Sequence, residues 1–79
     1  MDSPTPADII ASREAVQAAR SLGITSAQDW CADQVRVARR TWQSWEYGDR
    51  SMLPGLWELL TIKLAMHNVR IPASPSNTA

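Results

Sequence analysis

Two tryptophans three residues apart, Trp42 and Trp45, constrain the fold of this chain more than any other feature. On a helix they share one face, because residues three and four apart are neighbours on a helix surface. The polar residues of the same stretch are left on another face. Gly48 follows closely, and glycine is typical of the position just past the end of a helix. The sequence therefore predicts a short helix over 38–47 with one apolar and one polar face.

Length and composition predict one small domain. The chain has 79 residues, 44% of them apolar, with four tryptophans and no phenylalanine, so a few large rings must fill much of a thin core. The formal net charge is zero, which argues against non-specific coating of nucleic acid. Residues 36–50 nevertheless carry a local balance of +2, and we expect the remaining acidic residues to lie elsewhere. The arginines of this stretch are Arg36, Arg39, Arg40 and Arg50.

Several classes of protein are disfavoured by the residues that the chain lacks. A single cysteine, Cys31, cannot form an intrachain disulfide, and with His67 as the one histidine the chain cannot build a zinc finger. The longest apolar stretch, 56–66, is too short to span a bilayer, and the N-terminus does not have the pattern of a signal peptide. We expect a cytoplasmic protein without metal or cofactor. Without a nucleophile, an acid–base pair or a phosphate loop, we do not expect an enzyme.

Helix start and stop signals predict an all-α fold. Thr5-Pro6 starts a helix over 6–21 that Gly23 ends, although Ser12 offers a later start. Ser26 matches the capping-box pattern for a helix over 27–34, and Pro54 starts a last helix that reaches about residue 68. We expect a mobile lead over 1–5, a domain over 6–69 and a disordered tail over 70–79. The short link around 35–37 between the second and third helices is the helix-turn-helix arrangement.

A family resemblance rests on two stretches. Residues 37–50 resemble the second half of the Cro/repressor-type (XRE) helix-turn-helix family, which has apolar residues at the positions of Trp42 and Trp45, then Glu, any residue and Gly. The run 52–60 resembles a subgroup found in phages and integrated elements. The chain departs from the family at Arg36, where glycine is common, at Ala38, where Ser or Thr caps the helix, and in about two extra residues before Ala32. The resemblance implies a compact Cro-like domain of four to five helices.

The resemblance also implies roles for individual residues. Arg and Gln can pair with guanine and adenine edges through two hydrogen bonds each. The residues implied to contact bases are Arg39, Arg40, Gln43 and Ser44. Those implied or expected to contact phosphates are Gln28, Arg36, Thr41, Arg50 and Ser51. A solvated charged face is the alternative for the first set, and surface ion pairs are the alternative for Arg36 and Arg50.

Other residues are expected to hold the fold together. The residues expected in the core are Cys31, Ala32, Trp42, Trp45, Leu56 and Leu60. Glu46 is expected to form an ion pair with Arg20 of the first helix. The last helix is apolar nearly all round, so part of it, namely Trp57, Leu64 and Met66, is expected either to form a dimer interface or to lie deeper in the core. Trp30 is left open between a buried position and a contact surface.

These expectations combine into one functional hypothesis with two alternatives. The chain is expected to bind duplex DNA sequence-specifically as a transcriptional regulator, most simply a repressor that acts as a homodimer on a palindromic operator of a phage or mobile element. One alternative is an antitoxin-like autoregulator whose last helix or tail binds a partner protein. The other is a helix-turn-helix used only for protein interaction.

Overall fold

Four helices form the structure, a computed structural model that describes residues 3–71. They are α1 (Pro6–Arg20), α2 (Ile24–Gln34), α3 (Arg39–Tyr47) and α4 (Pro54–Met66), and this part of the chain contains no strand. The prediction of an all-α fold with four helices is confirmed. The third helix starts one residue later than predicted, and the last one ends two residues earlier.

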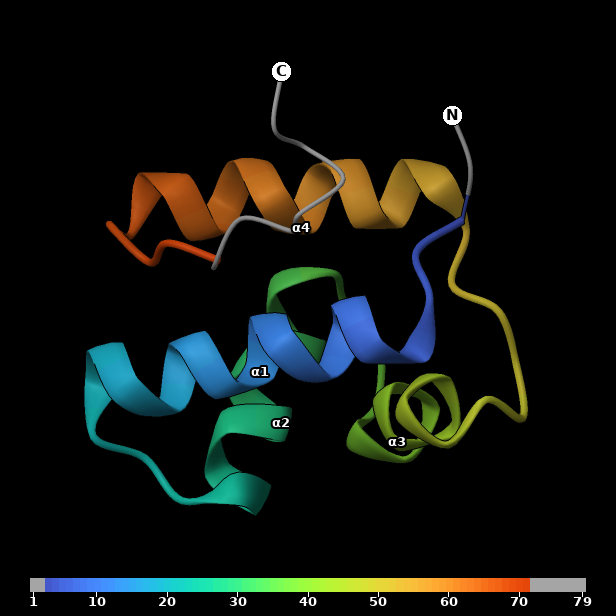
Figure 1. Ribbon diagram of the computed structural model, residues 1–79, viewed down its shortest axis with the longest axis horizontal. Coiled ribbons are helices and arrows are strands. Elements are labelled where there is room, and N and C mark those ends of the chain that lie inside the picture. The colour runs from blue at the N-terminus through green and yellow to red at the C-terminus, as the bar shows by residue number, and fades with distance from the viewer. Residues whose placement is uncertain (1–2, 72–79) are drawn as a thin grey trace.

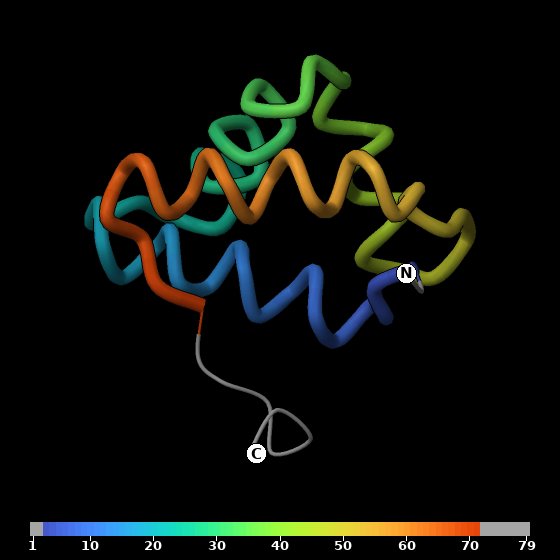
Figure 2. Tube along the Cα trace, turned by 90° about the horizontal axis from the view of Figure 1, so that it is seen from above, coloured from blue at the N-terminus to red at the C-terminus, as the bar shows by residue number. Residues whose placement is uncertain are grey.

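The helices surround a single core (Figure 1). α1 runs through the middle of the molecule, with α2 and α3 packed against it on one side and α4 along the opposite edge. α3 is seen almost end-on in Figure 1, whereas α1 and α4 run across the view. In Figure 2, seen from above, α4 appears between α1 and the α2–α3 pair. This arrangement leaves one side of α3 facing solvent, far from α4.

The first helix begins as predicted but ends differently. The Thr5 side chain accepts a hydrogen bond from the Asp8 amide, and the Asp8 carboxylate accepts one from the Thr5 amide, which closes a capping box. At the other end Ser21, with φ of 56°, takes the left-handed conformation that Gly23 was predicted to supply. Gly23 instead precedes α2 in an extended conformation. The second helix therefore starts at Ile24, and the predicted cap at Ser26 is wrong because Ser26 lies inside the first turn.

The turn between α2 and α3 carries two unfavourable residues. Arg36 has φ of 62°, a left-handed conformation that glycine adopts without steric cost. Ala38 stands at the N-cap of α3 and has no side chain to satisfy the free amides of the first turn. Both positions are those where the chain departs from the XRE pattern. Gly48, with φ of 84°, ends α3 as predicted.

The core is built around the two tryptophans. Trp42 is fully buried, and its ring meets Trp45 edge-to-face with centroids 5.8 Å apart. Of the residues predicted in the core, Leu56 is only partly buried and packs against the core, and the others are buried. Met52, in the loop between α3 and α4, is also fully buried, although it was not among the residues predicted in the core. The buried members of the predicted set are Cys31, Ala32, Trp42, Trp45 and Leu60.

The two ends of the domain pack more closely than predicted. Pro4 is buried and Thr5 caps α1, so the lead expected over 1–5 is part of the fold from Pro4 onward. At the other end Val69 is buried and Ile71 is packed against the core. The rest of the predicted lead and tail, residues 1–2 and 72–79, lies outside the described residues.

Candidate nucleic-acid interface

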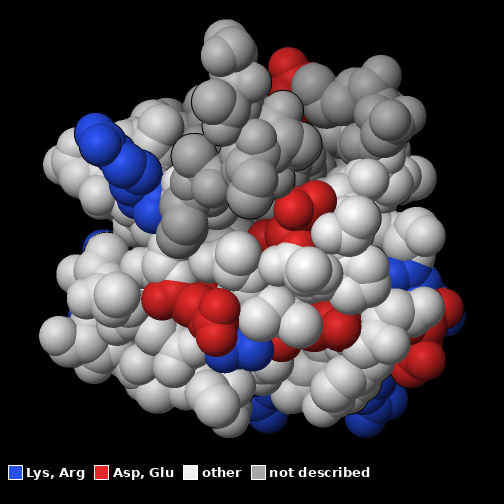
Figure 3. Space-filling model, viewed as in Figure 1, with Lys and Arg blue, Asp and Glu red and all other residues white. Residues whose placement is uncertain are grey.

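The polar face of α3 is turned toward solvent. Trp42, Trp45 and Glu46 take the buried side of this helix, so the helical period places Arg40 and Tyr47 on the opposite side. Arg40 is exposed and forms no ion pair with any residue that the structure describes. Figure 3 shows basic side chains along the lower edge of the molecule, the side on which α3 lies. The helix therefore presents the guanidinium group of Arg40 near the N-terminal end of its outer face.

Two polar contacts tie this face of α3 to α2. The Arg39 Nη1 atom donates to the Asp29 Oδ2 atom at 3.0 Å, and both side chains remain about half exposed. One turn further along, the Gln43 amide nitrogen donates to the Gln28 side-chain oxygen at 3.1 Å. Because Arg39 and Gln43 are four residues apart, the two hydrogen bonds lie on neighbouring turns of α3, on the side that faces α2. Side chains predicted to contact bases are thus positioned by the neighbouring helix before any ligand is bound.

Asp29 and Gln28 change the sequence-based description of this surface. Asp29 was expected to lie away from the arginines, but it lies beside Arg39 and lowers the positive charge there. Gln28 is nearly buried and braces Gln43. Its contact with a phosphate stays a prediction, and the structure gives it a bracing role. The family resemblance pointed to Gln28, whereas no sequence motif indicated a role for Asp29.

The remaining predicted contact residues lie along α3 and in the segments on either side of it. Ser44 donates through its hydroxyl to the Thr41 carbonyl at 2.6 Å, and both residues are half-buried. A shallow hollow on this side is lined by Arg40, Thr41, Ser44, Asp49 and Arg50, which brings the loop after α3 beside the helix. A second hollow between α2 and α3 is lined by Asp29, Arg39 and Arg40 among others. Arg40 borders both hollows.

Two further residues predicted to contact phosphate lie outside these hollows. Arg36 is exposed at the turn before α3, where its backbone takes the left-handed conformation described above. Ser51 is exposed in the loop between α3 and α4, next to Arg50. The flanks of α3 therefore carry a cation on each side, Arg36 before the helix and Arg50 after it.

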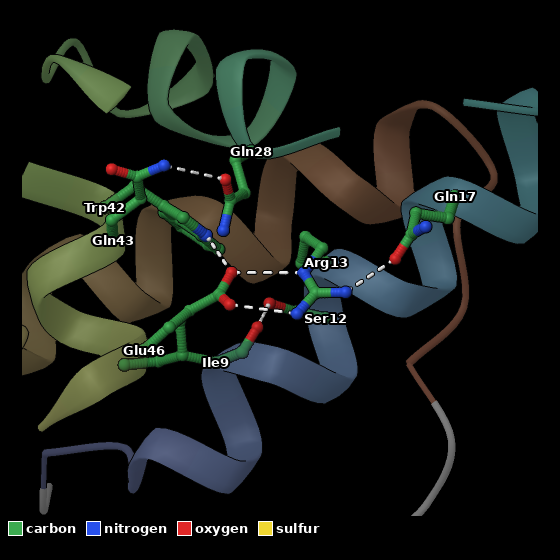
Figure 4. A network of polar contacts seen from close by, with 8 residues as sticks. All are labelled: Ile9, Ser12, Arg13, Gln17, Gln28, Trp42, Gln43 and Glu46. Atoms are coloured by element: carbon green, nitrogen blue, oxygen red, sulfur yellow. Dashed lines mark hydrogen bonds and ion pairs between the residues drawn. The ribbon is translucent and has the colours of Figure 1, made fainter. Parts of the chain in front are cut away.

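A buried network fixes α3 against α1 (Figure 4). Arg13 donates from Nε and Nη2 to the two oxygens of Glu46, at 3.2 and 2.9 Å. The Trp42 indole nitrogen donates to the same carboxylate at 2.6 Å, and Arg13 also donates to the Gln17 side-chain oxygen. The hydrogen bond to Glu46 raises the pKa of Arg13 above its ordinary value. With every carboxylate oxygen paired, Glu46 holds the outer face of α3 at a set angle to α1.

The predicted partner of Glu46, Arg20, was wrong. Arg13 and Arg20 are seven residues apart on one face of α1, but they are separated by two turns, about 10 Å along the axis. α3 crosses α1 at the level of Arg13. Arg20 instead places its guanidinium carbon 5.2 Å from the centre of the Trp30 ring. Trp30 is half-buried, and its ring meets His67 edge-to-face with centroids 5.2 Å apart, so Trp30 joins the ends of α1, α2 and α4.

The structure divides the α4 residues that were expected either at a dimer interface or deeper in the core. Leu64 is almost fully buried in the core, and Trp57 is partly buried and packed against it, which is the second alternative. Met66 is exposed, together with Leu59 and Ile62. Of the three residues, only Met66 therefore lies on an apolar face of α4 that is open to a partner.

Three further features of residues 3–71 bear on the chemistry open to this part of the chain. No group of three or more His, Cys, Asp or Glu side chains is placed to hold a metal ion in this part of the chain. None of its helices combines the length and the apolar character that crossing a bilayer requires. Cys31 is buried, and burial raises the pKa of its thiol to about 12, in keeping with its predicted role as a small core residue.

No protein-family model and no curated protein sequence matches this chain. Function must therefore be inferred from the geometry of the surface around α3.

Proposed function

We propose that the protein binds duplex DNA sequence-specifically and regulates transcription, with α3 as the helix that enters the major groove. The observation that carries this proposal is the outer face of α3, where Arg40 is free and Arg39 and Gln43 are braced by α2. A major groove accepts one α-helix, and its base edges are read by side chains with paired donors and acceptors. The resemblance to the XRE family supports the same assignment.

Each side chain on this face suits a particular contact. The unpaired guanidinium of Arg40 can donate two hydrogen bonds to one guanine, the commonest specific contact between proteins and DNA. Gln43 keeps its side-chain oxygen available, because its nitrogen is the atom engaged with Gln28. Ser44 lies one position beyond Gln43, where its hydroxyl can rotate toward a base. Arg39 donates to Asp29 from its Nη1 atom, so only the other nitrogens of its guanidinium group can donate to a base or a phosphate.

Phosphate contacts would come from both flanks of α3. Arg36 and Arg50 stand before and after the helix, and Ser51 and Thr41 can donate hydroxyl hydrogen bonds beside them. Such contacts fix the position of a helix in its groove and carry no sequence information themselves. The free amides at the uncapped N-terminus of α3 can also donate hydrogen bonds to a phosphate oxygen, since Ala38 leaves them without a side-chain cap.

Two copies are needed for useful specificity. One domain of this size covers only a few base pairs, and regulators of this kind reach high discrimination by reading two half-sites in one operator. We propose a homodimer that reads two inverted half-sites and represses by covering a promoter in the cytoplasm, in a phage or mobile-element setting. The direction of regulation follows from where the operator lies relative to the promoter.

Selection from a random duplex pool tests this function. We expect enrichment of a short motif that occurs as an inverted pair. The variant Arg40→Ala should lose the discrimination at one guanine, about 10- to 100-fold, while keeping its helical content. Arg70→Ala is the matched control, because Arg70 is an exposed arginine beyond α4, and its selected motif should be unchanged.

The same selection separates this proposal from its alternative. A pool that stays random after several rounds, with a folded protein, would refute sequence-specific binding and favour a helix-turn-helix used for protein contacts. Enrichment of a motif that Arg40→Ala leaves unaltered would refute the assigned reading face while leaving DNA binding in place.

A further inference from the structure

The outer face of α4 carries an apolar stripe that nothing in residues 3–71 covers. Leu59, Ile62 and Met66 are 37%, 52% and 74% exposed, large values for such side chains. Their spacing of three and four residues places them on one line along the helix. Leu60 and Leu64 take the opposite side and are buried in the core. α4 therefore has two apolar faces, of which one is used by its own domain.

The spacing of the stripe is that of a coiled coil. Leu59 and Met66 occupy successive a positions of a heptad, and Ile62 occupies the d position between them. Gly55 falls on the preceding d position, where an added Cβ would meet no atom within 4 Å. The b and f positions, Leu60 and Leu64, face the domain core. A second helix can therefore pack on the stripe without disturbing the fold.

The charges beside the stripe identify its occupant. Glu58 stands at the g position on one flank and Lys63 at the e position on the other. Neither forms an ion pair with any described residue. In a parallel pair of identical helices, each g residue faces the e residue five positions later in the other chain, so Glu58 of each copy meets Lys63 of the other. In an antiparallel pair, the same flank would bring Glu58 against Glu58 and Lys63 against Lys63.

We infer that the face formed by Leu59, Ile62 and Met66 binds a second copy of this chain, with the two α4 helices parallel. α4 lies on the edge of the molecule remote from α3, so this pairing leaves both outer faces of α3 open (Figure 1). That the pair serves to read two half-sites rests on the proposed function, whereas the pairing itself does not. With 13 residues in α4, the interface is small, and we expect a dissociation constant of roughly 10–100 µM.

Sedimentation equilibrium without DNA tests the pairing. The full chain should be a monomer at low concentration and a dimer at about 500 µM. Ile62→Glu should remain a monomer over this range. Leu53→Glu is the matched control, because Leu53 is 66% exposed but lies off the stripe, and it should dimerise as the unaltered chain does. Gly55→Leu, which fills the vacant d position, should tighten the dimer severalfold.

Charge exchange tests the parallel orientation. Glu58→Lys alone and Lys63→Glu alone should each weaken the dimer about fivefold, and the double exchange should restore it. An antiparallel pair would respond little to either single change, because like charges already face each other in it. Met66→Cys should form a disulfide between copies under mild oxidation, since equivalent a positions lie side by side in a parallel pair.

The outcomes separate this inference from the proposed function. A chain that stays monomeric at the highest concentration, or an Ile62→Glu variant that still dimerises, would overturn the assigned interface. Single charge variants that dimerise normally would overturn the parallel arrangement. Because none of these measurements contains DNA, either result leaves the selection experiment, and with it the DNA-reading proposal, to be decided separately.

Discussion

Cys31 is the residue whose chemistry differs most from its ordinary behaviour. It is buried among apolar side chains, and burial raises the pKa of its thiol from 9.0 to about 12. In the unfolded chain the thiol loses its proton near pH 9, whereas in the folded chain it keeps the proton. Above pH 9 the folded state therefore binds more protons than the unfolded state, and the stability of the fold falls as pH rises.

We predict that this thiol contributes a pH-dependent loss of stability between pH 9 and about pH 12. The free energy of unfolding should fall by at most about 1.4 kcal/mol per pH unit from this group. Urea unfolding at intervals from about pH 8 to about pH 10.5 measures the slope. Cys31→Ala removes the titrating group, so its slope should be shallower by that amount. Equal slopes in the two proteins would contradict the pKa assigned to Cys31.

Residue identities alone did not predict which of two arginines pairs with Glu46. Arg13 and Arg20 share a face of α1, and only the level at which α3 crosses α1 selects Arg13. By contrast, comparison with the XRE pattern marked both weak positions of the α2–α3 turn. Glycine is common in that family where Arg36 takes the left-handed conformation, and Ser or Thr is common where Ala38 leaves α3 without a side-chain cap. The pattern therefore located these two positions, whereas the choice between Arg13 and Arg20 depended on how α3 crosses α1.

At the scale of elements, the contact between α2 and α3 determines what α3 can read. Asp29 holds Arg39 across this contact, and Gln28 holds Gln43. An arginine that is already held in an ion pair loses less conformational entropy when it binds a base than an arginine without a partner. An arginine without a partner can instead adopt many conformations and contact whichever phosphate is near. Asp29 also repels the DNA backbone, so it opposes binding to unmatched sequences more than it opposes a matched one.

We predict that Asp29→Ala makes the protein bind random DNA more tightly and distinguish the selected site less well. Loss of the negative charge should raise affinity for random duplex severalfold, while the ratio between the selected site and random duplex falls by about tenfold. Fluorescence anisotropy with both duplexes at one salt concentration measures the ratio. Asp33→Ala, an exposed acidic variant on α2 without a contact to Arg39, should raise both affinities without changing their ratio. A ratio unaffected by Asp29→Ala would show that the ion pair has no part in selectivity.

The elements themselves were largely predictable, and their faces were predicted less well. Proline and capping residues gave the starts of α1 and α4, and Gly48 gave the end of α3. α2 starts three residues early, because Ser21 rather than Gly23 takes the left-handed position and the chain re-enters a helix sooner. On α4, apolar residues occur on all sides of the helix, so the sequence pattern did not indicate which side is buried. Only the burial of Leu60 and Leu64 in the core of the folded chain separated the core face from the free stripe.

At the scale of the whole molecule, charge is balanced in total but uneven in place. Eight basic and eight acidic side chains give zero net charge. Within residues 3–71, Arg36, Arg40 and Arg50 form no ion pair around α3, while Arg13 and Arg39 are paired. Long-range attraction to DNA should therefore be weak, and affinity should depend on a few phosphate contacts close to α3. This distribution sets how steeply binding falls with salt.

We predict a shallow salt dependence for binding to the selected site. Each phosphate neutralised contributes about −0.9 to the slope of log affinity against log salt, so two or three contacts per copy give a slope of roughly −2 to −3 per copy. Titrations over a range of potassium chloride concentrations measure it. Arg50→Ala should make the slope shallower by about 0.9 per copy without changing the order in which related sequences bind, because a phosphate contact carries no sequence information. Arg40→Ala should do the reverse, changing that order with little effect on the slope. A slope twice as steep would mean that DNA contacts basic residues beyond the surface of α3, such as Lys63 or Arg70. Because Lys63 stands beside the apolar stripe on α4, DNA bound there would prevent the stripe from pairing with a second copy.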